Sequence, residues 1–370
     1  MALPTSGAIS LANVNTELGV ASNTTRSLND AAVRSLFGKA SGVISMSDGY
    51  GKSSLWKGTI SSNQLQLNLR QWAIANGWNG TAAAEITIAP GVYVYSDNTA
   101  AAALVIDGSW PAGIALVNNG YIMGKGGKGG GGAGYGDYTL VAPGAGGPAI
   151  SLWTPVSISG NGYICGGGGG GATSASERGG GGGQGGGQGG DASVQGYNPS
   201  TGTPSEPWFA AGGAGGAVGA AGSNGTYNGN TVWLYVAVSG GGGGRAVPGS
   251  ATAGHNTSTT GYNMIVLPGL GGTGGGTGAA QGESSKGEVV YIHSGGGGAA
   301  GQAGENGDGI WKLSLGGGGF GAQGGSAIAN ADYGTPGVAG GLGGKAVNLN
   351  GLSITWVGGF PSSRVFGAVS

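Results

Sequence analysis

Uninterrupted runs of glycine constrain what this chain can fold into more than any other feature. Glycine accounts for 95 of the 370 residues, and from about Gly124 to Gly344 glycine runs alternate with short apolar segments. Because glycine has no side chain to pack and loses the most conformational freedom on ordering, such runs do not form ordinary helices or strands. The longest runs are Gly166–Gly171, Gly179–Gly183 and Gly240–Gly244.

Two common explanations of glycine-rich sequence do not fit this composition. Disordered chains usually carry high net charge and few aromatic residues, whereas here charged residues are 8% and the net charge is −1. Collagen needs glycine at every third position with abundant proline, and this chain has 13 prolines and no strict period. The sequence therefore predicts an ordered structure built mainly from backbone.

Polyglycine II fits these runs best. In polyproline II geometry a chain has three residues per turn and leaves its own amides unpaired, so neighbouring helices can bond to one another. Ordering a residue costs roughly 1 to 2 kcal/mol of free energy, and a net hydrogen bond returns about 1. The glycine runs therefore need apolar segments that pack at their ends and hold them in place, which we call clamps. Strand-like segments at 231–238, 288–293 and 310–315, each running into a glycine run, are predicted to be those clamps.

The remaining composition narrows the functional classes. Cys165, the single cysteine, is expected to be a small core residue. The near-neutral charge argues against a nucleic-acid partner. No signal peptide is visible and no apolar span approaches the roughly 20 residues that cross a bilayer, so we expect synthesis in a cytoplasm without export by the usual route.

Residues 1–57 carry most of the helix signals. The sequence Ser27–Asp30 reads as a cap for a helix over 31–37 that ends at Gly38. A shorter helix is predicted over 11–18, and a strand leading into a turn over 42–53. This part is predicted to be a small α/β module.

Residues 58–123 read as a β-rich connector. Leu65, Leu67 and Leu69 alternate with polar residues, and 70–76 is a candidate helix. The stretch 86–95 is predicted to be a hairpin, with Pro90 and Gly91 in a type II turn.

An internal repeat marks the entry into the glycine-rich part. The pattern Asn-Gly-Tyr-Ile-x-Gly occurs at 119–124 and at 161–166, each time preceded by alternating apolar residues and followed by glycine. A degenerate third copy is suggested at 350–358. If it is real, the chain leaves a β layer, crosses the glycine region several times and closes on the same layer.

Polar segments with aromatic residues lie between the glycine runs and are the candidate binding loops. The stretches 195–209 and 245–262 are rich in tyrosine, tryptophan, serine, asparagine and glycine, a composition typical of recognition surfaces. Trp233, Trp311 and Trp356, inside strand-like runs, are interpreted as clamps of the glycine region. The predicted binding residues are Tyr197, Trp208, Phe209, Tyr227, His255, Tyr262 and Tyr333.

No pattern predicts catalysis, a metal or a cofactor, and we expect a protein that is not an enzyme. The acids are scattered, and only Glu305 and Asp308 lie close together, in a sequence typical of a solvated turn. His255 and His293 lack partners at zinc-ligand spacing. The stretch 124–128, Gly-Lys-Gly-Gly-Lys, lacks the spacing of a phosphate-binding loop.

The first 55 residues or so resemble a known module. The phrases at 9–19, 27–38 and 44–53 are similar to the N-terminal module of tailed-bacteriophage tail fibre and tail-tip proteins and occur in the family's order. That resemblance implies attachment to the tail through residues 1–57. The segment 65–124 also resembles the β-rich connectors that precede glycine-rich tips in phage tail proteins. A small independent domain of other purpose is the alternative.

The alternation of glycine runs and loops is similar to the receptor-binding adhesins at the fibre tips of T-even-like phages. This resemblance is one of pattern over 124–344, and it implies a polyglycine II sandwich that presents loops to an outer-membrane protein or lipopolysaccharide. Those adhesins are separate caps on a trimeric fibre, whereas here an attachment-like module lies on the same chain, so a homotrimer and a single copy both stay open.

Together these features predict a mainly β and irregular fold in three parts: a virion attachment module (1–57), a β-rich connector (58–123) and a glycine-rich polyglycine II domain with binding loops and closing C-terminal strands (124–370). The expected function is that of a virion tail adhesin that binds other tail or baseplate proteins and a host surface. The alternatives are a purely structural tail-tip component and a spike that cleaves surface polysaccharide with paired carboxylates.

Overall fold

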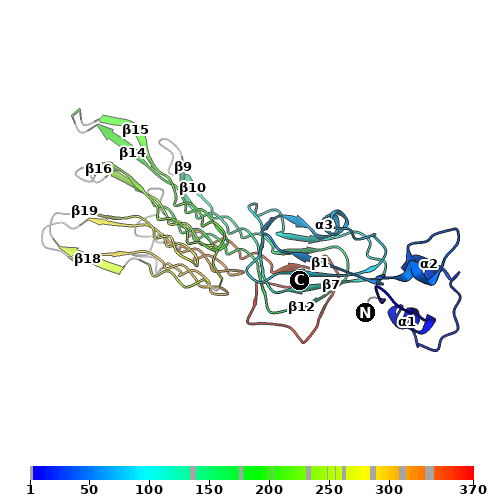
Figure 1. The fold of residues 1–370 in the computed structure, drawn as a ribbon. Coiled ribbons are helices and arrows are strands. Elements are labelled where there is room, and N and C mark those ends of the chain that lie inside the picture. Colours follow the sequence, from blue (N-terminus) through cyan, green and yellow to red (C-terminus); the bar gives the residue numbers. More distant parts are fainter. Residues whose placement is uncertain are drawn as a thin grey trace.

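The computed structural model places a helical module at one end, a parallel β-helix in the middle and the glycine-rich part at the other end (Figure 1). The elements at its two ends are the helices α1 and α2 and a set of β-ribbons. No helix among the described residues is long and apolar enough to cross a membrane. The structure describes residues 3–133, 139–174, 178–198, 200–201, 203–230, 235–247, 249–254, 256–260, 264–283, 289–307, 314–329 and 337–370.

The N-terminal module confirms both predicted helices. These are α1 (Leu11–Glu17) and α2 (Ala31–Phe37), and Gly38 ends α2 in the left-handed conformation at φ 70°. The strand predicted over 42–53 is wrong. A 3₁₀ helix, η1 (Met46–Gly49), forms instead, because the Asp48 carboxylate accepts a hydrogen bond from the Ser45 backbone N–H at 2.9 Å and closes the turn.

The connector begins a coil of short strands that continues at 150–165 and 347–366 and builds three parallel sheets. Each turn of the coil contributes one strand to each sheet in succession, and every pairing between turns is parallel. The first sheet contains β1 (Leu55–Ile60), β4 (Ala83–Ile88), β7 (Ile114–Asn118), β12 (Val156–Ser159) and β23 (Ile354–Trp356). The second contains β2 (Gln64–Leu65), β5 (Tyr93–Tyr95), β8 (Tyr121–Met123), β13 (Tyr163–Cys165) and β24 (Val365–Phe366). The third contains β3 (Leu67–Asn68), β6 (Leu104–Ile106), β11 (Ile150–Leu152) and β22 (Val347–Asn348).

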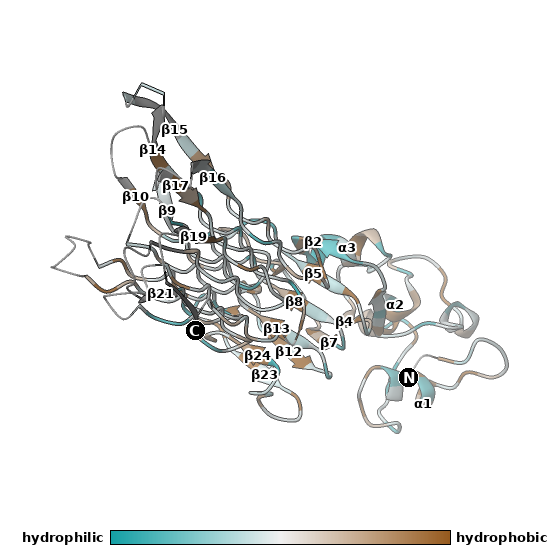
Figure 2. Cartoon of the chain, turned by 90° about the vertical axis from the view of Figure 1, so that its left-hand side faces the viewer, coloured by the Kyte–Doolittle hydropathy of each residue, from teal (hydrophilic) through white to brown (hydrophobic). Residues whose placement is uncertain are grey.

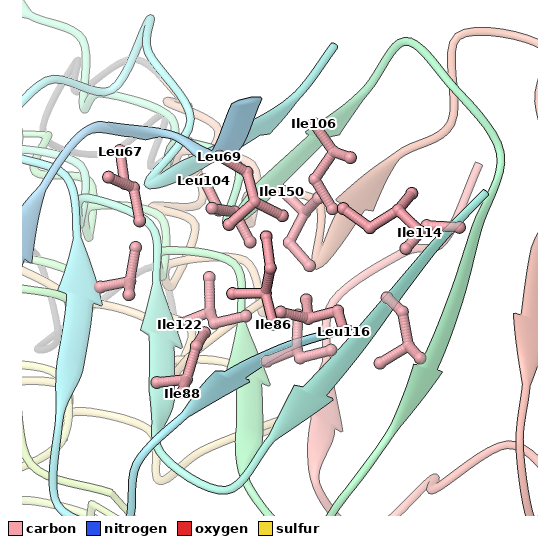
Figure 3. Close-up of a cluster of buried hydrophobic side chains, with 14 of the residues drawn as sticks. Leu67, Leu69, Ile86, Ile88, Leu104, Ile106, Ile114, Leu116, Ile122 and Ile150 are labelled. Carbon is pink, nitrogen blue, oxygen red and sulfur yellow. The ribbon is translucent and has the colours of Figure 1, made fainter. Parts of the chain in front are cut away.

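The main apolar core fills the inside of this coil. Ile86 pairs with Leu116, which pairs with Ile158, so aliphatic side chains stack from turn to turn. Figure 3 shows such side chains from all three sheets pointing toward one another, among them Leu104 and Ile122, both fully buried. The predicted helix at 70–76 is confirmed as α3 (Leu69–Ala75), which follows β3.

The hairpin predicted over 86–95 is wrong. Strands β4 and β5 belong to different sheets and pair with preceding and following turns of the coil rather than with each other. The predicted type II turn agrees with the backbone at Gly91, whose φ of +78° is the value that such a turn requires at this position. The pair Pro90 and Gly91 therefore forms a corner of the β-helix.

The internal repeat is one turn of this coil. Tyr121 pairs with Tyr163 and Met123 with Cys165, so the two copies lie directly over each other. The suggested third copy at 350–358 does not stack on the other two. Its Ile354 pairs with Val156 of β12, the strand that precedes the second copy. The residue that pairs with Ile164 of the second copy is Val365, which lies beyond 350–358. The closure on the same layer is confirmed, since β23 and β24 are the last strands of their sheets.

The glycine-rich part consists of two excursions from the β-helix. The chain leaves after β8 and returns at β11, and leaves again after β13 and returns at β22. Both excursions start from the second sheet and end in the third. We call the bonded glycine runs of these excursions, outside the ribbons described below, the glycine lattice. The lattice runs are pale in Figure 2, because glycine is neither strongly apolar nor strongly polar.

The run Gly166–Gly171 shows how the lattice is bonded. Successive N–H groups donate to three different neighbouring segments, and the same neighbour recurs every third residue, as expected for three residues per turn. An added Cβ at any of these six glycines would lie 1.7 to 2.2 Å from a carbonyl oxygen of another run. The bonds run from Gly167 and Gly170 to Gly147 and Gly144, from Gly168 and Gly171 to Gln184 and Gly181, and from Gly169 and Ala172 to Ala322 and Gly325.

A stack of aromatic rings along the second sheet packs against the glycine lattice. The rings of Tyr93, Tyr121, Tyr163 and Phe366 follow one another with centroids 4.5, 5.9 and 6.3 Å apart. They pack in one cluster with the fully buried Phe320 of the lattice. Cys165, in the same cluster, is buried as expected, and this burial raises the pKa of its thiol.

Candidate recognition surface

Antiparallel ribbons lie at the end of the molecule farthest from the helical module (Figure 1). The described residues form five two-stranded ribbons. They pair β9 (Gly131–Ala133) with β10 (Thr139–Val141), β14 (Ala192–Asn198) with β15 (Thr203–Ala210), β16 (Tyr227–Asn230) with β17 (Tyr235–Val238), β18 (Asn256–Thr260) with β21 (Val289–His293), and β19 (Met264–Leu267) with β20 (Ala280–Glu283).

The ribbons begin where the glycine runs stop. Larger residues cannot enter a lattice with carbonyls about 2 Å from each Cβ position, so the chain changes to paired strands. Small residues mediate the change: Ala192, Ala210 and Ala237 are buried together at the bases of two ribbons. Contacts join β9 to β14, β15 to β16, β17 to β19 and β20 to β21, so the ribbons form one continuous row.

Three predicted binding residues have described side chains on these ribbons. Trp208 and Phe209 lie on β15 and Tyr227 lies on β16. Phe209 and Tyr227 are 52% and 59% exposed, and Trp208 is half-buried. Since β15 contacts β16, these aromatic residues belong to neighbouring strands.

The other predicted binding residues are placed less fully. Tyr197 is on β14, paired with Pro204 of β15. His255, Tyr262 and Tyr333 lie outside the described residues.

The stretch predicted as a loop over 195–209 is a ribbon instead. Pro204 and Pro207 are unusual within a strand, because proline removes a ladder hydrogen bond. Pro204 pairs with Tyr197, and Pro207 lies where the register shifts between Val194 and Gly196, a place at which the ladder is already interrupted.

The strand segments predicted as clamps are only partly described. The second half of the stretch 231–238 is confirmed as a strand, β17, and all of 288–293 after its first residue is confirmed as β21; both run into glycine. Residues 231–234 and 310–313, with Trp233 and Trp311, lie outside the described residues. The interpretation of Trp356 as a clamp of the glycine region is wrong, because Trp356 lies on β23 and packs against the β-helix core.

The lysines near the first excursion hold ion pairs. Lys128 Nζ lies 2.5 Å from Asp191 Oδ2, and Lys125 Nζ lies 3.9 Å from Asp97 Oδ1. Glu305 Oε2 accepts a hydrogen bond from the Gly296 N–H at 2.9 Å, whereas Asp308 is outside the described residues. Within the part of the chain that the structure describes, no group of three or more His, Cys, Asp and Glu could hold a metal ion.

The arrangement therefore exposes the aromatic side chains of Phe209 and Tyr227 on neighbouring ribbons. Sequence analysis missed a second exposed site, a pocket on the β-helix between the turn 160–162 and the segment 357–364. The available signal was the unusual length of that segment, which carries Phe360 and Arg364 between two short strands.

Comparison with known proteins identifies the family. A family model described as phage tail fibre adhesin Gp38 matches residues 56–261, more than half of the chain and the part from β1 through β18. No curated protein matches the sequence. Among solved structures, the chain is similar to the crystal structure of the gp37-gp38 adhesin tip complex of the bacteriophage S16 long tail fibre, with 18% identity and a TM-score of 0.40 over 98% of this chain and 99% of that one. The chain belongs to the family of phage tail fibre adhesins of the Gp38 type and is a component of the virion tail.

Proposed function

We propose that this adhesin attaches to the tail through residues 1–57 and recognises a host bacterial surface receptor, an outer-membrane protein or lipopolysaccharide, through its ribbons. The main support for this proposal is that the helical module lies at one end of the molecule and the ribbons with the exposed Phe209 and Tyr227 lie at the other (Figure 1). An adhesin needs this separation, because one end must stay bound to the fibre while the other meets the cell.

We also propose that the lattice has polyglycine II geometry and acts as a stiff support for these ribbons. The support for this is the hydrogen-bond period of three in the run Gly166–Gly171. A recognition site on rigid elements loses less conformational entropy on binding than one on loops. The number of copies on the fibre, three or one, can be measured as the mass of the complex between this chain and its fibre partner.

Binding to cells that the phage infects tests the proposal. Replacing Trp208 or Phe209 by alanine is expected to weaken binding of the purified full chain about 30-fold, since truncating an aromatic hot spot removes about 2 kcal/mol of binding free energy. Trp153→Ala is the matched control, because Trp153 is 61% exposed but lies on the β-helix, directly after β11.

The same assay separates the alternatives. A folded protein that binds no susceptible cell, with or without the substitutions, would show a purely structural tail-tip role. Release of oligosaccharides from purified host polysaccharide would show a depolymerase. Equal losses in Trp153→Ala and Trp208→Ala would place recognition away from the ribbons.

A further inference from the structure

The pocket on the β-helix arises from an irregular last turn of the coil. The chain passes from β7 to β8 through residues 119–120 and from β12 to β13 through 160–162, and these short turns lie over each other, with Asn161 N donating to Asn119 Oδ1 at 3.2 Å. The last turn passes from β23 to β24 through the much longer segment 357–364. That segment cannot follow the same path, so it bulges outward and leaves a cavity of about 310 Å³ against the turn 160–162.

Two aromatic side chains form one wall. Trp356 and Phe360 meet edge to face with ring centroids 5.3 Å apart and planes at 82°. Phe360 is 52% exposed, and Gly358 and Gly359 have φ of +90° and +92°, which is the conformation that makes this bend. Aromatic faces of this kind pack against the C–H groups of a ring-shaped polar ligand.

A single cation, Arg364, is among the residues that line the pocket. Arg364 Nη1 donates to Asn161 Oδ1 at 3.0 Å. Its Nε is shielded from solvent and has no hydrogen-bond partner among the residues that the structure describes. None of the residues that line the pocket is acidic. A shielded guanidinium donor without a partner is unfavourable, and a carboxylate or phosphate is the group whose oxygens match its planar fork.

The floor of the pocket is preformed. Asn118 is 2% exposed, its Nδ2 donates to the Tyr163 carbonyl at 3.1 Å, and its Oδ1 accepts from Gly120 N at 3.2 Å. Its amide is thus committed to the fold. Asn161, whose Oδ1 is taken by Arg364, keeps two Nδ2 donor hydrogens for a hydroxyl or ring oxygen.

We propose that this pocket binds an anionic sugar, with the carboxylate or phosphate at Arg364 and the ring against Trp356 and Phe360. The volume lies at the lower end of the range for small-molecule sites, about 300 to 1,000 Å³, which suits a single sugar unit at the end or side of a glycan. The site is built on β7, β12, β13 and β23 and on the segment 357–364. It shares no residue with the ribbons, so it does not depend on the function proposed for them.

Calorimetric titration of the full chain tests this inference with four probes: methyl glucuronide, glucose 1-phosphate, methyl glucoside and inorganic phosphate. We expect millimolar binding of one or both anionic sugars and at least tenfold weaker binding of the neutral glucoside and of phosphate alone. The glucuronide and the sugar phosphate distinguish a carboxylate from a phosphate as the recognised group.

Variants complete the test. Arg364→Gln is expected to lower affinity for the anionic sugar about tenfold or more, and Phe360→Ala to weaken all sugars while keeping the preference for anions. Arg70→Gln is the matched control, since Arg70 also lies near a tryptophan of the β-helix, 5.7 Å from the Trp78 ring, but outside the pocket.

Three results would overturn the proposal. They are no binding of either anionic sugar to the folded wild type, equal binding of the neutral glucoside, and equal affinity in Arg364→Gln and the wild type. If inorganic phosphate bound as tightly as the sugars, the site would be one for ions only. A single thermal transition with an unchanged midpoint in Arg364→Gln shows that this variant is folded. If it is not folded, the affinity of Phe360→Ala for the sugars tests the proposal instead.

Discussion

Replacing Gly169 by alanine is expected to destabilise the glycine lattice by about 3 kcal/mol or more. A Cβ at this position would lie 1.7 Å from the Gly341 carbonyl oxygen, and Gly169 N donates at 2.9 Å to the carbonyl of Ala322 on another run. One methyl group must therefore push apart segments that hydrogen bonds hold together. For a unit of this size, such a loss lowers the midpoint of thermal unfolding by about 10 °C, which scanning calorimetry of the full chain measures.

Gly337→Ala is the matched control for this substitution. Gly337 also lies in the glycine-rich part, is exposed and has no positive φ, but its nearest contact to an added Cβ is Ala329 N at 3.2 Å. A small shift relieves that contact, so we expect a change within about 0.5 kcal/mol, as at ordinary surface positions. Equal stability of the two variants would contradict the close approach of backbones on which the lattice depends.

The lattice could be anticipated from sequence because its requirement is local. A backbone surrounded by other backbones has no room for Cβ atoms at any of its three faces, and the sequence reports this directly as unbroken runs such as Gly166–Gly171. The neighbours of each run could not be anticipated. Gly169 bonds to a segment more than a hundred residues later, and glycine carries no side chain that could specify the choice.

The β-helix escaped sequence analysis for a different reason. Its strands are short, and β11 and β22 are parallel neighbours with Ile150 opposite Val347, although the whole second excursion separates them. Alternation within 86–95 reads equally well as a hairpin or as a corner between two sheets. Only the copies at 119–124 and 161–166 indicated stacking, since their identical spacing repeats the geometry of one turn.

The candidate sites show the same division. Composition alone led to the prediction of Trp208, Phe209 and Tyr227 as binding residues, because aromatic residues in polar stretches can be recognised without knowledge of the fold. Their role in binding stays a prediction. The pocket at Arg364 and Asn161 joins residues from two turns of the coil. The length of the segment 357–364 indicates an irregular turn, but no local pattern shows which residues of the neighbouring turn it meets.

Asp97→Asn is expected to destabilise the junction between the lattice and the β-helix by about 3 kcal/mol. The Arg245 side chain, 5% exposed, donates from Nε to the Gly185 carbonyl at 2.9 Å and from Nη2 to the Ser96 carbonyl at 3.2 Å and to Asp97 Oδ1. Asp97 supplies the negative charge of this junction, and its loss leaves a buried cation unpaired. Because Asp97 is itself half exposed, the effect falls at the lower end of the range for broken buried pairs.

Lys125→Met is expected to act in the opposite direction. Burial and, after it, the nearby Arg245 charge lower the pKa of Lys125, while Asp97 raises it. The fold therefore disfavours the charged ammonium, and an apolar side chain of similar length should leave stability unchanged or increase it. In the Asp97→Asn background the same substitution should restore part of the lost stability, because it removes one of two cations that no longer share an anion.

The pH dependence of wild-type stability follows from the same shift. In the interval from the lowered pKa of Lys125 in the folded protein up to its ordinary value of 10.5, the unfolded chain binds more protons than the folded one. Stability should therefore rise with pH across that interval, and Lys125→Met should remove this contribution. Chemical denaturation of the wild type, the two single variants and the double variant measures the interaction free energy between Asp97 and Lys125. If Lys125→Met lost as much stability as Asp97→Asn, the ammonium of Lys125, rather than Arg245, would be the cation that Asp97 stabilises.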